Sequence, residues 1–167
     1  KCPFILTAHG FDVPGHNPDH FKLLHKLIRP LWNKVALSAK TVVAPSNHLV
    51  DLIKISNSRI SLNSIPNGIA TDLFNERQKR SEFLIVSRLI QTKNYQTFFE
   101  ALRHVPTPQI VHVVGDGPML PRLQELSETI PQHKVTFHGW LASGSTKWRE
   151  LFETCRFFIF PSKSENF

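Results

Sequence analysis

Cysteine is scarce in this sequence of 167 residues, which has only Cys2 and Cys155, at opposite ends of the chain. Small secreted domains that depend on disulfides carry many more, so the count argues against a disulfide framework and fits a reducing compartment. Both cysteines are interpreted as ordinary small side chains. The first residues also lack the charged start and the apolar stretch of a signal peptide, so we expect a cytoplasmic protein.

Long hydrophobic runs are missing as well. The longest lie at 110–114 and 157–160, far short of the about 20 residues that a membrane span needs. A Walker A loop, a Ser-His-Asp nucleophile elbow and a C-x-x-C pair are absent too, which argues against the enzyme classes that depend on them. Acidic residues are outnumbered, 13 against 20 basic ones, which gives a net charge of +7.

The remaining composition, 41% hydrophobic and 20% charged, is that of a globular protein. Short apolar runs alternate with stretches in which apolar residues recur at helical spacing, a pattern typical of parallel sheets covered by helices. The expected strands are 4–8, 41–44, 60–65, 83–86, 110–114, 135–137 and 157–160. The expected helices are 19–39, kinked or split at Pro30, a short one after the N-cap Ser46, 94–104, 119–129 and 148–154.

A polar, charged stretch divides the pattern in two. Residues 75–80 read NERQKR, and the strand–helix alternation restarts after them. We therefore assign residues 1–70 to the end of a first α/β domain, 71–81 to a linker and 82–167 to the first part of a second domain. The three strands before the linker are too few for an independent layer, so we expect a piece of a longer protein, truncated at both ends.

Candidate ligand-binding residues follow the strands of the second domain, at the edge where open parallel sheets bind ligands. Arg88 and Lys93 follow the strand at 83–86, and we expect Thr92 to cap the next helix. Two cations beside a helix N-terminus would suit a pyrophosphate. The alternative is a solvated loop with two ordinary surface charges.

Three further loops follow later strands. Gly115, Asp116 and Gly117 follow the strand at 110–114, and paired glycines permit close approach of backbone to a ligand. Their spacing is not that of a dinucleotide fingerprint. Trp140 could frame a base or pack in the core, and Glu165 could hold sugar hydroxyls or simply be exposed.

Histidines and aspartates gather near the start of the chain. They are His9, Asp12, His16, Asp19, His20 and His25. A zinc site needs ligands that converge from a rigid backbone. Gly15 and Pro18 interrupt any helix that could align His16 with His20, so we expect no metal.

Basic side chains also lie along the first amphipathic stretch, namely Lys22, Lys26, Arg29, Lys34 and Lys40. Such a face could sit on an anionic membrane surface, at the inner side of the membrane, or could be an ordinary solvated helix face. A nucleic-acid partner is not expected, because no basic platform interleaved with aromatic residues is visible.

Six short motifs occur in an order that resembles the family 4 retaining glycosyltransferases of the GT-B fold, known as glycosyl transferases group 1. They are residues 65–69 (IPNGI) with Phe74, 86–89 (VSRL) with Lys93 and Asn94, 114–118 (VGDGP), 135–139 (VTFHG), 160–162 (FPS) and 164–167 (SENF). The resemblance spans nearly the whole chain. It implies two facing Rossmann-like domains that hold the donor between them.

The resemblance also implies residue roles. Arg88 and Lys93 match the pair that binds the donor diphosphate and stabilises the leaving nucleotide, a stabilisation that needs no metal. Glu165 matches the first glutamate of the family's E-x7-E motif, which contacts the donor sugar, and His9 matches the histidine that reaches that sugar from the first domain. The remaining implied donor contacts are the loop at Gly115, Asp116 and Gly117, the base contacts Trp140 and Leu141, and the backbone of Asn166 and Phe167.

The family would move a hexose-type sugar from a nucleotide-diphosphate sugar to a glycan or lipid-linked acceptor, without a cofactor, in cell-envelope polysaccharide synthesis. Three departures stand out. Ser87 replaces a common glycine, the second glutamate is absent because the chain ends at Phe167, and the Gly-rich loop that opens the first domain is missing. We therefore expect the 167 residues alone to be inactive. A GT-B nucleotide-sugar epimerase and a non-enzymatic basic nucleic-acid-binding module are the alternatives.

Overall fold

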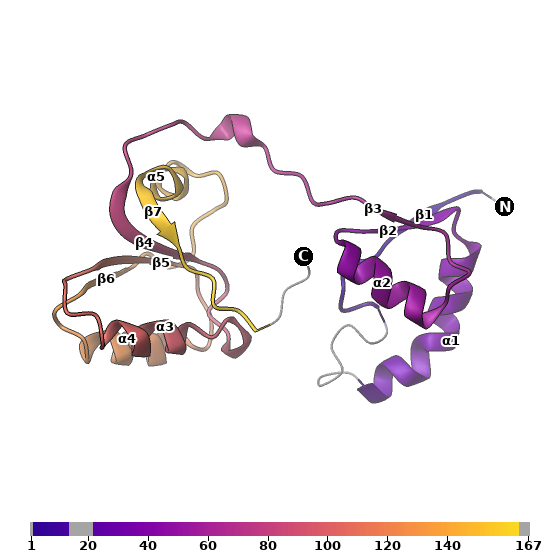
Figure 1. The fold of residues 1–167 in the computed structure, drawn as a ribbon, viewed down its shortest axis with the longest axis horizontal. Coiled ribbons are helices and arrows are strands. Elements are labelled where there is room, and N and C mark those ends of the chain that lie inside the picture. Colours follow the sequence, from indigo (N-terminus) through magenta and orange to yellow (C-terminus); the bar gives the residue numbers. More distant parts are fainter. Residues whose placement is uncertain (1, 14–21, 164–167) are drawn as a thin grey trace. The chain divides into compact units, whose positions relative to one another are not determined.

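The structure is a computed structural model that describes residues 2–13 and 22–163. The chain divides into two compact units, one ending at Ile69 and the other beginning at Ala70 (Figure 1). Each unit is built on its own parallel sheet covered by helices, which confirms the α/β fold class expected from the alternating pattern.

The first unit is a three-stranded parallel sheet with two helices. Its sheet order is β1-β2-β3. Both crossovers step the same way across the sheet, so right-handed connections place both helices on one face (Figure 1). The bounds are β1 Ile5–Thr7, α1 Lys22–Ser38, β2 Thr41–Ala44, α2 Asn47–Ser56 and β3 Leu62–Ser64. The core between sheet and helices includes Ala36, Val42, Ala44, Leu49 and Ile53.

Helix α1 runs on through Pro30 as one helix, so the expected split at this proline is wrong. Pro30 lies on the exposed side of the helix. A proline removes one backbone donor, but His25 and Ala36, one on either side of it, are both buried against the rest of the unit. Helix α2 begins as expected, with the Ser46 side chain accepting a hydrogen bond from the Leu49 backbone N–H.

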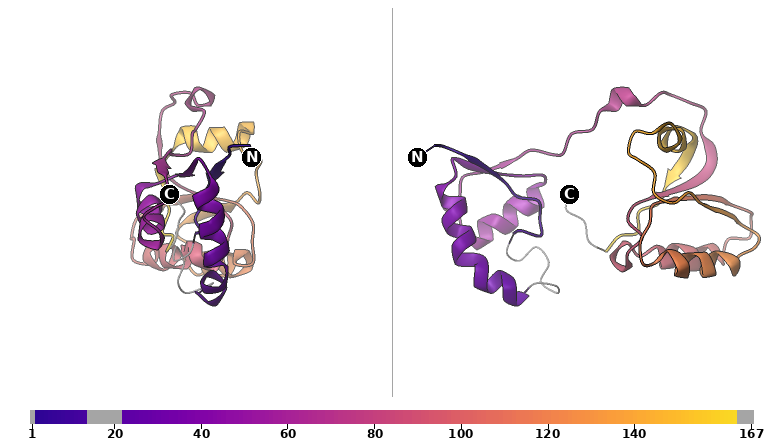
Figure 2. Two further views of the ribbon diagram at one scale, coloured as in Figure 1. Left: turned by 90° about the vertical axis from the view of Figure 1, so that its right-hand side faces the viewer. Right: turned by 180° about the vertical axis from the view of Figure 1, so that it is seen from behind.

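The second unit is a four-stranded parallel sheet of order β6-β5-β4-β7. Helices α3 and α4 cover one face and α5 covers the other, as Figure 1 and the reverse view in Figure 2 show. The bounds are β4 Arg80–Val86, α3 Tyr95–Leu102, β5 Ile110–Val114, α4 Leu120–Glu128, β6 Lys134–Phe137, α5 Thr146–Thr154 and β7 Cys155–Phe158. The last strand was expected at 157–160 and begins two residues earlier, because Cys155 pairs with Arg80.

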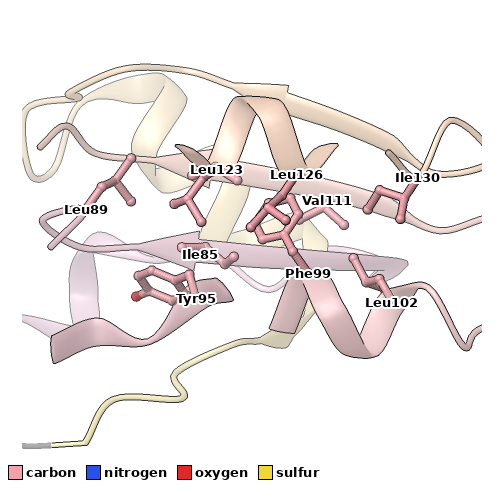
Figure 3. Close-up of a cluster of buried hydrophobic side chains, with 10 residues drawn as sticks. Ile85, Leu89, Tyr95, Phe99, Leu102, Val111, Leu123, Leu126 and Ile130 are labelled. Carbon is pink, nitrogen blue, oxygen red and sulfur yellow. The ribbon is translucent and has the colours of Figure 1, made fainter. Parts of the chain in front are cut away.

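The main core of this unit lies between the sheet and the pair α3 and α4. Figure 3 shows Ile85 and Val111 from the strands facing Phe99 of α3 and Leu123 of α4. Phe99 is almost fully buried, and complete burial of such a side chain stabilises the fold by about 1.5–3 kcal/mol. This core fixes β4 and β5, the two strands whose following loops carry most of the predicted donor-binding residues.

The opposite face of the sheet, under α5, carries buried and partly buried polar groups. Glu82 of β4, His112 of β5 and Cys155 of β7 lie there, and His138 follows β6. Burial, and secondly the carboxylate of Glu82, raise the pKa of the Cys155 thiol. Burial, and secondly the ring of His112, lower the pKa of His138.

The stretch assigned to a linker, 71–81, is attached to α5. It contains a short 3-10 helix, Thr71–Leu73, and its last two residues already belong to β4. The Asn75 backbone N–H donates to Glu153 Oε1 at 2.9 Å, and Arg77 Nε lies 2.7 Å from Glu153 Oε2. Phe74 packs against Trp148 and against another α5 aromatic ring, with centroid distances of 5.7 and 6.1 Å.

Candidate functional site

Three loops that follow β4, β5 and β6 meet at the carboxyl edge of the second sheet. Their backbones are joined by hydrogen bonds: Ser87 N–H donates to Val114 O at 3.1 Å, and Leu89 N–H donates to Asp116 O at 2.8 Å. The loop after β6 joins them through Gly115 N–H and the carbonyl oxygen of Gly139, 2.8 Å apart. The ligand-binding edge expected from the sequence is therefore one connected surface.

The glycines of the Gly-Asp-Gly turn are required by packing of the loops on each other. A Cβ on Gly115 would overlap the carbonyl oxygen of Ser87, and a Cβ on Gly117 would lie 2.5 Å from the carbonyl oxygen of Leu89. Both residues also have positive φ, 131° and 150°, which side chains strongly disfavour. Paired glycines were expected to permit close approach of a ligand, whereas their Cβ positions are taken by neighbouring backbone.

A cavity of about 210 Å³ opens between these loops. Its lining combines a cation, a carboxylate, an indole and apolar side chains. The lining residues are Val86, Ser87, Arg88, Val114, Gly115, Asp116, Trp140 and Leu141. Five of the residues singled out from the sequence thus share one cavity: Arg88, Gly115, Asp116, Trp140 and Leu141.

Trp140 is 73% exposed. The alternative that it packs in the core is therefore wrong, and its ring is available at the mouth of the cavity. Leu141 beside it packs partly against the small core under α5. An exposed aromatic face next to an apolar wall is a surface on which a planar base can stack.

Arg88 is exposed, but its backbone is held firmly. The Tyr95 hydroxyl donates to Ser87 Oγ at 2.8 Å, and Ser87 Oγ donates to the carbonyl oxygen of Arg88 at 2.9 Å. Tyr95, which begins α3 and is almost fully buried, was not predicted to support this loop. Ser87 was noted only as a departure from glycine, and the structure gives its hydroxyl this loop-fixing contact.

Lys93 lies on the other side of β4, toward β7, where the strand order reverses. Its Nζ stands over the ring of Phe160, 5.2 Å from the centroid. Backbone contacts join the two segments, since Lys163 N–H donates to Thr92 O at 3.0 Å. Reversal points of this kind are where open α/β sheets bind ligands.

Thr92 is not the cap of α3, which corrects the sequence prediction. Residues Gln91–Lys93 form a 3-10 turn, and the N-cap is Asn94 in the left-handed conformation, φ 57° and ψ 30°. No side chain caps this helix. The cap of α3 therefore lies two residues later than expected, and the first backbone N–H groups of the helix lie after Lys93 and not around it.

His9 belongs to the first unit, where it follows β1 and is exposed. Its backbone N–H donates to Asp12 Oδ1 at 2.8 Å, which fixes the turn after the strand. Its implied contact with the donor sugar stays a prediction. The implied donor contacts Glu165, Asn166 and Phe167 lie outside the described residues. The same holds for His16, Asp19 and His20, which were considered as metal ligands.

His25, which was also considered as a metal ligand, is buried, and its Nε2 lies 3.0 Å from the carbonyl oxygen of Phe11. Among residues 2–13 and 22–163, one group of three metal-ligating side chains converges, and it lies in the second unit: Glu82, His112 and Cys155. No sequence motif indicated this group, because its members lie far apart in the chain. In the part of the chain that the structure describes, no helix combines the length and apolar character needed to cross a bilayer.

Comparisons with known proteins agree with this architecture. HepE of Anabaena, in complex with UDP and glucose, matches with a TM-score of 0.71 at 18% identity over 98% of this chain and 47% of its own. The lipopolysaccharide outer core galactosyltransferase WaaB matches with a TM-score of 0.61 at 23% identity over 78% of this chain and 39% of its own. TarM of S. aureus matches with a TM-score of 0.71 at 14% identity over 99% of this chain and 33% of its own.

These likenesses show the GT-B fold, and the chain spans less than half the length of each of these three proteins. A comparison with curated proteins found no match. Residues 72–167, which include every loop of the cavity, match the family described as Glycosyl transferases group 1. The chain therefore belongs to the glycosyl transferases group 1 family.

Proposed function

We propose that this chain supplies the donor-binding part of a retaining glycosyltransferase that uses a nucleotide-diphosphate sugar. The observation that carries the proposal is the cavity at the carboxyl ends of β4 and β5, in which Arg88 and the exposed ring of Trp140 line the same space. An indole can stack on a base while a guanidinium binds a phosphate in bidentate fashion. The two groups together match a nucleoside diphosphate.

Arg88 and Lys93 would act on the leaving group. Departure of a nucleoside diphosphate from the sugar builds negative charge on phosphate oxygens, and fixed cations lower the barrier by stabilising that charge. Arg88 lies at the cavity, and Lys93 lies on the β7 side of the same strand end. A diphosphate that reached across the end of β4 would meet both.

UDP is the first probe to use, because structures of HepE contain UDP and UDP-glucose. Isothermal titration of the 167-residue chain with UDP tests binding without requiring turnover. We expect Arg88→Gln to weaken binding about 10- to 100-fold, the range expected for a lost charge-assisted hydrogen bond. Lys93→Gln is also expected to weaken UDP binding.

Arg122→Gln is the matched control. Arg122 is an exposed arginine on α4 whose partner is Glu125 one turn away, so the variant loses the same charge without touching the cavity. Equal UDP affinity in the Arg88 and Arg122 variants would refute the donor site. Steeply salt-dependent binding with no preference for nucleotide sugars would instead indicate a nucleic-acid-binding module.

The acceptor side of the proposal concerns a glycan or lipid-linked acceptor in cell-envelope polysaccharide synthesis, held near an anionic membrane surface. Its support is α1, on which Leu23, Leu27 and Leu31 are exposed beside Lys26 and Lys34. An apolar stripe flanked by cations suits the interface of an anionic bilayer. Flotation with anionic and neutral vesicles tests this membrane contact. Equal recovery of the protein with both kinds of vesicle would refute it.

Retention and hexose transfer are tested on the full-length protein. A proton NMR time course of the product would show the anomeric configuration directly, and the expected product keeps that of the donor. Conversion of the nucleotide sugar in the absence of any acceptor would favour the epimerase alternative.

A further inference from the structure

A compact buried polar cluster lies on the face of the second sheet that α5 covers. Its members are Glu82 of β4, His112 of β5 and Cys155 of β7. Glu82 and Cys155 are buried and His112 is mostly so. One potential metal-ligand atom from each residue lies within 4.8 Å of the other two. None of the three lines the cavity described above.

The spacing of these atoms is close to that of ligands on one zinc ion. Glu82 Oε2 lies 3.3 Å from His112 Nε2 and 3.9 Å from Cys155 Sγ. Bonds of about 2.0–2.3 Å in a tetrahedron place neighbouring ligand atoms about 3–4 Å apart. Only a small movement of the side chains toward a common centre would therefore place all three ligand atoms within bonding distance of one ion.

The sheet itself holds the ligands. The three residues come from β5, β4 and β7, which are adjacent parallel strands. Ligands on a hydrogen-bonded sheet have little freedom to move apart, as a zinc site requires. The set of one sulfur, one imidazole nitrogen and one carboxylate oxygen suits zinc and similar ions, and does not suit magnesium or calcium.

His138 supplies a supporting contact. Its Nε2 lies 3.0 Å from His112 Nδ1. In the tautomer where His112 Nδ1–H donates to His138, the lone pair of His112 Nε2 faces Glu82. Histidines that bind metals generally donate their other ring N–H in this way, which fixes the orientation of the ring.

We propose that Glu82, His112 and Cys155 form a binding site for a zinc-like divalent cation, with a water molecule as fourth ligand. When the ion binds, the Cys155 thiol releases its proton to solvent and the thiolate sulfur bonds to the ion. Arg80 Nε lies 3.2 Å from Glu82 Oε2, and its side chain is half exposed. Arg80 therefore competes for the carboxylate and would swing outward when the ion enters.

Cobalt(II) is the direct probe, because a thiolate ligand gives it a near-ultraviolet charge-transfer band. The experiment uses the 167-residue chain carrying Cys2→Ser, which removes the exposed thiol and keeps Cys155. We expect the band to saturate at one equivalent of Co²⁺ and to disappear when Zn²⁺ is added. If no band forms at saturating Co²⁺, the proposal is wrong.

Variants of the cluster locate the site. Cys155→Ser should abolish the band, and His138→Phe should weaken Zn²⁺ binding about 10- to 100-fold, as loss of a supporting contact does. Arg80→Gln should tighten binding, since a competing cation is removed. His104→Gln, at an exposed histidine outside the cluster, is the control. Unchanged Zn²⁺ affinity in Cys155→Ser would show that the metal binds elsewhere and overturn the proposal.

Discussion

Gly115 lies against the carbonyl oxygen of Ser87 so closely that any side chain on residue 115 would overlap that oxygen. The contact joins the loop after β5 to the loop after β4, which carries Arg88. The neighbouring backbone N–H of Ser87 donates to Val114 at 3.1 Å, so neither segment can move away freely. The candidate donor site therefore depends on the absence of a β-carbon at one position.

Gly115→Ala should accordingly destabilise the protein by on the order of 3 kcal/mol, because overpacking against backbone adds to the strain of a positive φ. Chemical denaturation measures the loss. Gly144→Ala is the control: it shares a positive φ, 79°, but a Cβ there meets nothing within 4 Å. We expect about 1 kcal/mol for that variant. Equal losses would mean that φ strain, and not overlap with Ser87, accounts for the effect.

Trp140→Ala should weaken UDP binding about 5- to 150-fold, since stacking of a base on an aromatic ring contributes about 1–3 kcal/mol. Stability should change little, because the ring is exposed. Trp148→Ala provides the contrast. Trp148 packs against Phe74 and Phe152, so its loss should lower the melting temperature. A Trp140 variant that binds UDP normally would remove the indole from the proposed site.

The fold and much of the site follow from short-range sequence patterns. The apolar run of β5 is followed at once by Gly115, and this local signal placed the strand and its turn together. Arg88 and Trp140 were expected at one edge for the same reason, because parallel strands carry their following loops to one edge of the sheet, and both line the cavity there.

Contacts that depend on register across the sheet could not be predicted in this way. Glu82 and His112 are 30 residues apart in the chain, and Glu82 and Cys155 are 73 apart. No periodicity within one strand shows which of its residues will face these partners. Pro30 shows another limit, since α1 stays one helix through a proline at which the local preference predicted that two helices could form.

His133→Ala should destabilise the protein by about 1–3 kcal/mol. The Gln109 backbone N–H donates to His133 Nδ1 at 3.1 Å, so that nitrogen is unprotonated, and Nε2–H can donate to Leu102 O at 2.9 Å. Alanine would leave the half-buried Gln109 N–H without this partner, which costs about 1–3 kcal/mol. Leu102 O would keep the hydrogen bond that it accepts from Val105 N–H at 3.0 Å. Urea denaturation measures the change. His104→Ala, at an exposed histidine, should stay within about 0.5 kcal/mol.

The ion pair that ties residues 75–77 to α5 should make stability depend on acidic pH. The backbone N–H of Asn75, and then the charge of Arg77, lower the pKa of Glu153 below its ordinary value of 4.5. A carboxyl group whose pKa is lower in the folded state binds protons less readily there than in the unfolded chain. Its contribution is therefore complete above the unfolded pKa and is lost as the pH falls through the folded one.

We expect the melting temperature of the wild-type chain to fall as the pH decreases below about 4.5, and that of Glu153→Gln to fall less steeply. The variant should be less stable at pH 7, where Arg77 has lost its partner 2.7 Å away, and the two curves should converge in acid. Glu125→Gln, at an exposed carboxylate on α4 paired with Arg122 across one turn, should stay close to the wild type throughout. Parallel curves for wild type and Glu153→Gln would contradict the argument, because a constant difference means that the proton affinity of Glu153 is the same in both states.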